Sequence, residues 1–131
     1  MLPTDIKLHK KTALLELKYA DGGLYTLPAE FLRVYSPSAE VRGHGQGQEV
    51  LQTGKLHVKI ASIDTIGNYA IRLNFDDGHN TGIFSWEYLR ELSLHQQVMW
   101  DEYLERMRAA NARREPLDSS VQVVNIMPLK H

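Results

Sequence analysis

The segment YAIRLNFDDGH, residues 69–79, decides the fold. Apolar side chains occupy every second position from Tyr69 to Phe75, which is the pattern of a strand with one buried face. Asp77-Gly78 follows directly and is a strong signal for a tight hairpin turn, because glycine adopts positive φ angles without steric cost. We therefore predict a central strand that turns back into a second strand ending at Phe84.

Further strands are predicted on the N-terminal side of this segment. Residues 57–66 form a strand that reaches it through the two-residue turn Gly67-Asn68. Near the N-terminus, residues 13–19 alternate between apolar and polar side chains, and Asp21-Gly22-Gly23 is a turn signal. Residues 24–27 then return as the partner of that strand. The pattern indicates an antiparallel sheet.

Three helices are predicted from capping and periodicity. Pro28 suits the first turn of a short helix over residues 29–35, and Ser85 caps a second over residues 86–92. Ser93 and Gln96 form a capping box that begins a third helix. Its buried face is predicted at positions spaced by three and four: Trp100, Tyr103, Leu104 and Met107. Arg106 and Arg108 lie near its C-terminal end, where the helix dipole favours cations.

These elements predict an α+β fold. We expect an antiparallel sheet of about six strands, with a short helix after the first hairpin and a C-terminal helical segment. Residues 36–54 contain four glycines and read as a long loop, with a short strand near Val50 as an option. We expect residues 1–115 to form a single domain. The tail, residues 116–131, is either an added edge strand or a loose arm.

Composition narrows the function classes. The chain has 131 residues and a formal net charge of −1, which gives no general attraction to nucleic acid or anionic membrane. It contains no cysteine, which excludes disulfides, thiolate metal sites and cysteine nucleophiles. No apolar run approaches the roughly 18 residues of a membrane span, and the N-terminus lacks a signal-peptide core. We expect a soluble, cytoplasmic protein.

No catalytic motif is present in the sequence. The glycines at 43, 45 and 47 do not have the spacing of nucleotide-binding loops, and no serine lies in a G-x-S-x-G elbow. The pair Asp76-Asp77 is explained by turn formation. Tyr25, Trp86, Trp100 and Tyr103 are expected to be core residues and not a base-stacking platform. We therefore assign no catalytic residue and no cofactor.

A metal site is the alternative to a binding site without a catalytic residue or cofactor. His44 and His79 each flank a glycine in a predicted turn. Together with Asp76, Asp77 or Glu40 they would supply ligands for a metal carrier or a metal-dependent enzyme. Hydrogen-bonded turn histidines are commoner than ligands, and no H-x-x-x-H or H-E-x-x-H spacing is present.

The densest polar group beside the long loop consists of Arg33, Glu40, Arg42 and His44. One interpretation is a solvated face with an ion pair, which contributes little to stability. The other is a binding patch for an anion or a partner protein, because functional residues concentrate on loops held by a scaffold.

Two segments carry a family resemblance. Residues 27–45, LPAEFLRVYSPSAEVRGHG, resemble a signature of the DUF971 family, which is also named for the N-terminal domain of gamma-butyrobetaine hydroxylase. Residues 76–79, DDGH, followed by residues 85–89, SWEYL, resemble the second signature. The resemblance extends over roughly residues 4–110.

The resemblance implies a lost zinc site. In the hydroxylases this domain is a non-catalytic attachment to an iron- and 2-oxoglutarate-dependent domain, and it binds zinc through three cysteines and a histidine. The cysteine positions match Ser36, Ser38 and Val41, and the histidine matches His79. Serine and valine supply no thiolate, so no metal is expected here. We hypothesise that the serine hydroxyls instead bond nearby backbone N–H groups, and that Glu40 pairs with Arg33 or Arg42.

The resemblance also suggests a role. Related domains are fused to P-loop ATPases that carry iron–sulfur clusters, which implies an accessory role near iron–sulfur or redox proteins. The leading prediction is a non-enzymatic binding or adaptor domain for a protein partner, with neither nucleic acid nor membrane as a partner. A homo-oligomer joined through the apolar tail is a further alternative. The predicted contact surface consists of Arg33, Ser36, Ser38, Glu40, Arg42, His44 and His79.

Overall fold

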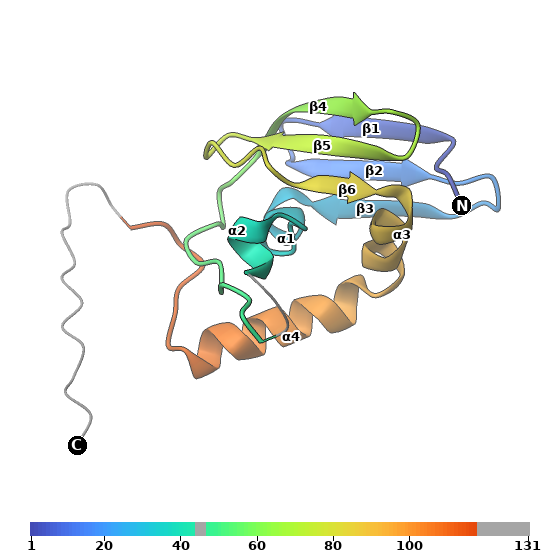
Figure 1. The fold of residues 1–131 in the computed structure, drawn as a ribbon. Coiled ribbons are helices and arrows are strands. Elements are labelled where there is room, and N and C mark those ends of the chain that lie inside the picture. The colour runs from blue at the N-terminus through green and yellow to red at the C-terminus, as the bar shows by residue number, and fades with distance from the viewer. Residues whose placement is uncertain (44–46, 118–131) are drawn as a thin grey trace, which may run out of the picture.

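The computed structural model describes residues 1–43 and 47–117 (Figure 1). Over these residues the chain forms six strands and four helices, which confirms the predicted α+β class. The elements are β1 (Asp5–His9), β2 (Leu14–Lys18), β3 (Leu24–Pro28), α1 (Ala29–Val34), α2 (Ala39–Arg42), β4 (Ile60–Ile66), β5 (Ala70–Phe75), β6 (Ile83–Ser85), α3 (Trp86–Leu94) and α4 (Gln96–Ala109). The predicted tail strand or arm lies outside the described residues, apart from its first two positions.

The strands form two antiparallel sheets of three strands each, in the orders β1-β2-β3 and β4-β5-β6. In β5 the alternation places Ile71 opposite Phe84 of β6 and Leu73 opposite Ile63 of β4. Both sheets contribute to one core, to which β2 adds Leu15 and Leu17. Each such side chain, fully buried, contributes about 1.5–3 kcal/mol to folding.

The helices lie along one side of the sheets, and α4 runs beneath α1 and α3 in Figure 1. Phe31 of α1 and Trp100 of α4 meet with ring centroids 6.3 Å apart. The predicted face of α4 is correct for Tyr103 and Met107, which are buried. It is wrong for Leu104, which is 37% exposed because α4 packs on only one narrow side.

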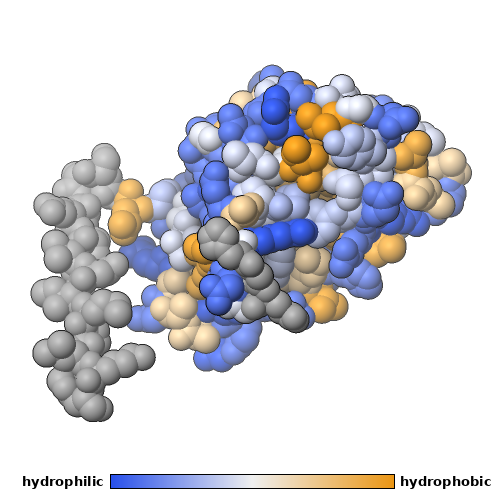
Figure 2. Space-filling model, viewed as in Figure 1, coloured by the Kyte–Doolittle hydropathy of each residue, from blue (hydrophilic) through white to orange (hydrophobic). Residues whose placement is uncertain are grey.

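Polar side chains cover most of the visible surface. Figure 2 shows that apolar residues gather in small separate groups among hydrophilic ones on the face seen in Figure 1. None of the helices in the described parts of the chain is both long and apolar enough to cross a membrane.

Several predicted strand bounds need correction. The strand assigned to residues 57–66 begins only at Ile60, and the strand assigned to residues 79–84 is limited to β6. Asp77-Gly78 does form a turn, in which the N–H of Phe75 donates to the carbonyl of His79 at 2.9 Å. Pairing does not continue directly from this turn, because the loop that follows carries His79 into the interior. Strand β1 was not predicted at all.

One helix start is confirmed and one is wrong. The hydroxyl of Ser85 accepts a hydrogen bond from the N–H of Tyr88 at 3.1 Å, as expected of a cap. Ser93 does not form a capping box, because it lies inside α3 and donates to the carbonyl of Leu89 at 2.8 Å. Helix α4 begins instead at Gln96, after a break at His95.

The described part of the long loop is mostly irregular, as predicted, but it contains the short helix α2. Val50 is not in a strand, although its N–H donates to the carbonyl of Val41 at 2.8 Å. This bond attaches the returning loop to α2. It thereby shapes the surface described next.

Candidate functional site

Three polar side chains from separate segments form a chain of hydrogen bonds that runs from the interior to the surface. Ser36 follows α1, Glu40 lies in the first turn of α2, and His79 lies in the loop after β5. The Oγ atom of Ser36 is 2.8 Å from Nε2 of His79, and an Oε atom of Glu40 is 3.1 Å from Nδ1. Ser36 and His79 are buried, whereas the Glu40 side chain is largely exposed.

The chemistry of the three groups fixes the proton positions. The exposed Glu40 carboxylate is an acceptor, so Nδ1 of His79 carries the proton and donates to it. In the neutral ring, Nε2 then accepts from the Ser36 hydroxyl. Burial lowers the pKa of His79, and the Arg33 guanidinium lowers it further, against the opposing effect of the Glu40 and Asp77 carboxylates. The ring is therefore neutral at pH 7.

The order Ser, His, acid is the order of a hydrolase triad, but the serine is closed off. Ser36 has no exposed surface, and the backbone of Gly82 lies directly over its hydroxyl. A methyl group added at Gly82 would lie only 2.3 Å from Oγ. A substrate carbonyl needs to reach about 3 Å from a nucleophile. Ser36 is among the residues that line the pocket described below, but it has no exposed surface that a substrate could contact.

A partly buried ion pair lies beside this chain of hydrogen bonds. The Nε–H of Arg33 donates to Asp77 at 2.9 Å, and Nη1 donates to the side chain of Gln52 at 3.0 Å. Asp77 also accepts from Lys55 at 3.1 Å and from the N–H of His79 at 3.2 Å. Burial alone would raise the pKa of Asp77, but these hydrogen bonds outweigh it and hold that pKa below its ordinary value.

The four positions matched to zinc ligands do not fit a zinc ion. Ser36, Ser38, Val41 and His79 are all buried, but they supply no thiolate, and both ring nitrogens of His79 already have partners. Within residues 1–43 and 47–117, no group of three or more His, Asp or Glu side chains could hold a metal ion. These residues form a hydrogen-bonded cluster instead.

The hypothesis about what replaces zinc is partly correct. The Ser36 hydroxyl does accept from the N–H of Ser38, at 3.4 Å, but its shorter bond is to His79. The Ser38 hydroxyl is buried without a hydrogen-bond partner among the described residues. The expected pairing of Glu40 with an arginine is wrong, because its carboxylate accepts from His79 and from Thr81.

The predicted contact residues separate into two groups. Arg33, Ser36, Ser38 and His79 are buried, so their side chains support the site from inside. The exposed members are Glu40 and Arg42. His44 lies outside the described residues, so the metal site built on His44 and His79 stays a prediction. Its proposed acids have other partners here: Asp76 accepts from the N–H of Lys59 at 2.9 Å.

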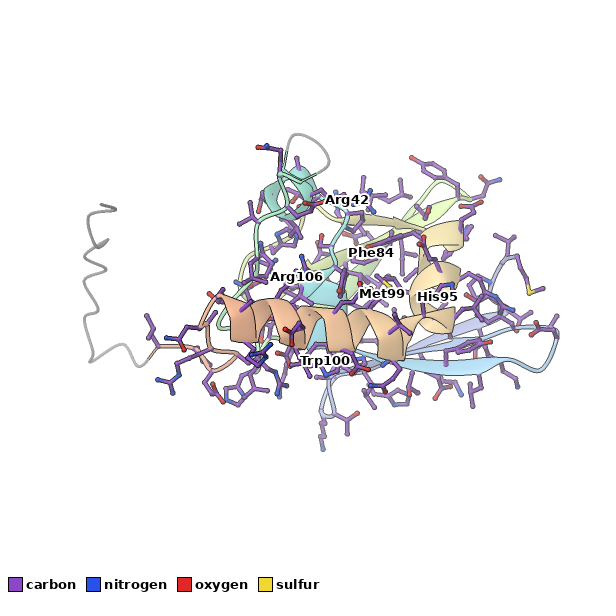
Figure 3. All side chains as sticks on the ribbon, turned by 90° about the horizontal axis from the view of Figure 1, so that it is seen from below. Arg42, Phe84, His95, Met99, Trp100 and Arg106 are labelled. Carbon is purple, nitrogen blue, oxygen red and sulfur yellow. The ribbon has the colours of Figure 1, made fainter. Side chains whose placement is uncertain are left out.

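A pocket of about 490 Å³ lies beside the cluster, between the end of α1, α2, residues 49–52, α3 and α4. Its apolar lining includes Val34, Val41 and Leu51. Arg42 of α2 and Arg106 of α4 also line it, and Figure 3 shows both side chains and their elements. Sequence reasoning identified Arg42 only, because Arg106 looks like an ordinary cation at a helix end.

Three tyrosines give the pocket rigid walls. The hydroxyls of Tyr88, Tyr35 and Tyr103 donate to the carbonyls of Tyr35, Met99 and Gln52 respectively, each at 2.6 Å. Burial raises the pKa of Tyr103 to about 12, so its phenol stays a donor. The Arg42 guanidinium lies 4.8 Å from the centre of the Tyr88 ring, and Arg106 lies 5.8 Å from that of Tyr35. These cation–π contacts hold both arginines at the pocket.

A comparison with family models assigns the chain to a known group of domains. The model described as "Gamma-butyrobetaine hydroxylase-like, N-terminal" matches residues 6–90, from β1 into α3. The chain belongs to this family. The match confirms the resemblance carried by the two sequence signatures. Helix α4, which supplies Tyr103 and Arg106 to the pocket, lies beyond the matched range.

Solved structures support the same assignment. Two NMR solution structures are 46% and 48% identical to the chain, with TM-scores of 0.78 and 0.75. Each covers 95% of this chain, and the chain covers 98% and 93% of them. A crystal structure of a DUF971 family protein from Acidithiobacillus ferrooxidans is 38% identical, with a TM-score of 0.55, over 70% of this chain and 91% of that one.

Family membership shows the fold of the domain but does not by itself assign an activity. The protein from Acidithiobacillus ferrooxidans is described as having unknown function. No curated protein matches the chain. A function for this gamma-butyrobetaine hydroxylase-like domain therefore has to be argued from its own cluster and pocket.

Proposed function

We propose that this domain is a non-catalytic accessory module that binds a partner protein through the pocket between α1, α2, α3 and α4. The pocket carries the proposal, because its volume of about 490 Å³ lies in the range typical of ligand sites. Its tyrosines and arginines are also the residue types enriched at binding hot spots. The buried cluster positions α2, and thereby Arg42, through the bond from His79 to Glu40.

The closed serine supports the non-catalytic part of the proposal. Ser36 has a histidine partner but no open approach, so we expect no covalent reaction with a serine-directed fluorophosphonate probe. Intact-mass spectrometry after incubation measures this directly. Labelling at Ser36 that disappears in His79→Gln would make the domain a hydrolase and overturn the proposal.

The cellular setting of the partner rests on the family alone. Fusion of related domains to P-loop ATPases of iron–sulfur carriage favours a partner among iron–sulfur or redox proteins of the cytoplasm. Alternatives are the metal site built on His44 and His79, and a homo-oligomer joined through the tail.

Affinity purification with pocket variants tests the proposal. Wild-type protein, Arg42→Ala and Arg106→Ala are compared with Arg108→Ala, whose exposed arginine pairs with Glu105 in α4. We expect a partner that is retained by the wild type and by Arg108→Ala and lost from both pocket variants. Equal recovery of the same partners with all four proteins, each shown to be folded by its NMR spectrum, would contradict the proposed site.

A further inference from the structure

The arginines of the described chain divide into two kinds. Six of the eight lie within 4 Å of a carboxylate: Arg33, Arg72, Arg90, Arg108, Arg113 and Arg114. Among the described residues, Arg42 and Arg106 have no carboxylate partner, and these are the two arginines that line the pocket. Among the arginines of the described residues, a carboxylate partner is thus missing only at this pocket.

Each of the two arginines nevertheless contacts a tyrosine ring. Arg42 lies over the Tyr88 ring, and Arg106 lies over the Tyr35 ring with Nη2 3.5 Å from its hydroxyl. A tyrosine face holds the guanidinium plane while its N–H groups remain available to an acceptor. Glu49 also lines the pocket, and no ion pair joins it to either arginine. Counting these three charged lining residues, the pocket carries a net charge of +1.

The space between the cations suits an apolar group. Val34 and Val41 are buried beneath the pocket, and Leu51 and the tyrosine rings complete its lining. A ligand with an apolar group flanked by carboxylates therefore complements both the apolar lining and the two arginines of the pocket. Guanidinium groups bind carboxylates with paired hydrogen bonds, which are stronger than neutral ones.

We infer that the pocket recognises an acidic peptide segment in which an apolar or aromatic residue lies next to carboxylate side chains. This inference rests on the proposed function and specifies its ligand. An acidic segment is favoured over a chain terminus, because the two cations come from different helices, α2 and α4. Several carboxylates on one segment can satisfy both of them, whereas a terminus supplies one.

Peptide titrations followed by ¹H–¹⁵N NMR test the inference. The probes are Ac-Asp-Phe-Asp-NH₂, its neutral isostere Ac-Asn-Phe-Asn-NH₂, and Ac-Asn-Phe-Asn with a free C-terminal carboxylate. We expect the acidic peptide to shift resonances of Tyr35, Leu51 and Tyr88 and to bind at least about tenfold more tightly than the neutral peptide. Its affinity should fall with added salt and fall about tenfold in Arg42→Ala and in Arg106→Ala, but not in Arg108→Ala.

Different failures have different meanings. Equal binding of the acidic and neutral peptides would overturn the carboxylate inference and leave the proposed pocket function intact. If only the peptide with the free C-terminal carboxylate binds, the inference of an acidic segment is overturned, and the ligand is a chain terminus. If no peptide binds, the inference is overturned, and the affinity purification then decides separately whether the pocket binds a protein.

Discussion

Ser36 and Ser38 are two residues apart and both are buried, yet only the Ser36 hydroxyl bonds another side chain. Ser36 bonds His79, whereas the Ser38 hydroxyl has no partner among the described residues. Ser36→Ala leaves a buried ring nitrogen unsatisfied, so we expect a loss of about 1–3 kcal/mol in the free energy of unfolding. Ser38→Ala removes an unsatisfied group and should be neutral or stabilising. Urea unfolding at pH 7 measures both, and equal effects would contradict the assigned roles.

Gly82 is the second residue whose role can be tested by substitution. Its φ angle is not positive, so the constraint is the contact of 2.3 Å that an added methyl group would make with Ser36 Oγ. We expect Gly82→Ala to destabilise the protein by about 1–3 kcal/mol through overpacking. In the Ser36→Ala background the nearest remaining atoms are Phe84 Cε1 at 3.2 Å and the β-carbon of residue 36 at 3.4 Å, so the cost should be smaller. Additive effects in this double-mutant cycle would contradict the close approach.

Sequence reasoning identified Ser36, Glu40 and His79 individually but not their arrangement. Spacing along the chain predicts which side chains share a face of one element, and His79 lies about 40 residues from both Ser36 and Glu40. The zinc resemblance brought Ser36 and His79 together. It could not place Glu40 there, because no family ligand corresponds to that position. The metal hypothesis did group Glu40 with His79, but as ligands of one ion and not as hydrogen-bond partners.

Among the elements, α1 and the loop after β5 are joined by the pair of Arg33 and Asp77. The Arg33 side chain is only 8% exposed, so this carboxylate compensates the cost of burying its positive charge. We expect Asp77→Asn, which keeps the acceptor for the N–H of His79, to destabilise the protein by about 2 kcal/mol. The matched control is Asp64→Asn, whose pair with Arg72 is exposed and should matter little. Thermal unfolding that shifts equally for both variants would contradict a structural role for Asp77.

Prediction of the elements succeeded where local pattern and tertiary context agree. Strand β5 and the Ser85 cap have signals that need no partner to be recognised. Strand β1 has only Ile6 and Leu8 as half-buried apolar residues among exposed ones, so its identity comes from pairing with β2. Ser93 is the opposite case, because its sequence predicts a cap where none forms. It lies inside α3, and its hydroxyl donates to the carbonyl of Leu89.

At the scale of the whole molecule, the pocket lies beyond what the sequence predicts. Its lining comes from the end of α1, α2, the loop after it, α3 and α4, and these segments meet only when both sheets and the helices have packed. The family model matches only up to residue 90, so it does not include α4, although the resemblance seen in the sequence was expected to extend to about residue 110. The unpaired state of Arg42 and Arg106 likewise depends on where every carboxylate lies in the fold.

Global stability should depend on pH through His79. The folded state holds its pKa below the ordinary value of 6.5, through burial and Arg33, against Glu40 and Asp77. Between the folded and unfolded pKa values, the unfolded chain binds more protons, so stability rises with pH in that window. The contribution is fully present above pH 6.5 and is lost as the pH falls through the folded pKa. Asp77 changes the stability only at lower pH, because its folded-state pKa lies below its ordinary value of 3.8.

Urea unfolding of the wild type and of His79→Gln between pH 7.5 and 5 isolates this effect. We expect the wild type to lose stability as the pH decreases below 6.5 and the variant to lose less over the same range, although it starts from a lower stability at pH 7.5. The other histidines are common to both proteins, so the difference between the two curves belongs to His79. Parallel curves would mean that the ring has the same proton affinity in both states. The assignment of His79 as a buried, neutral histidine at the centre of the cluster would then be wrong.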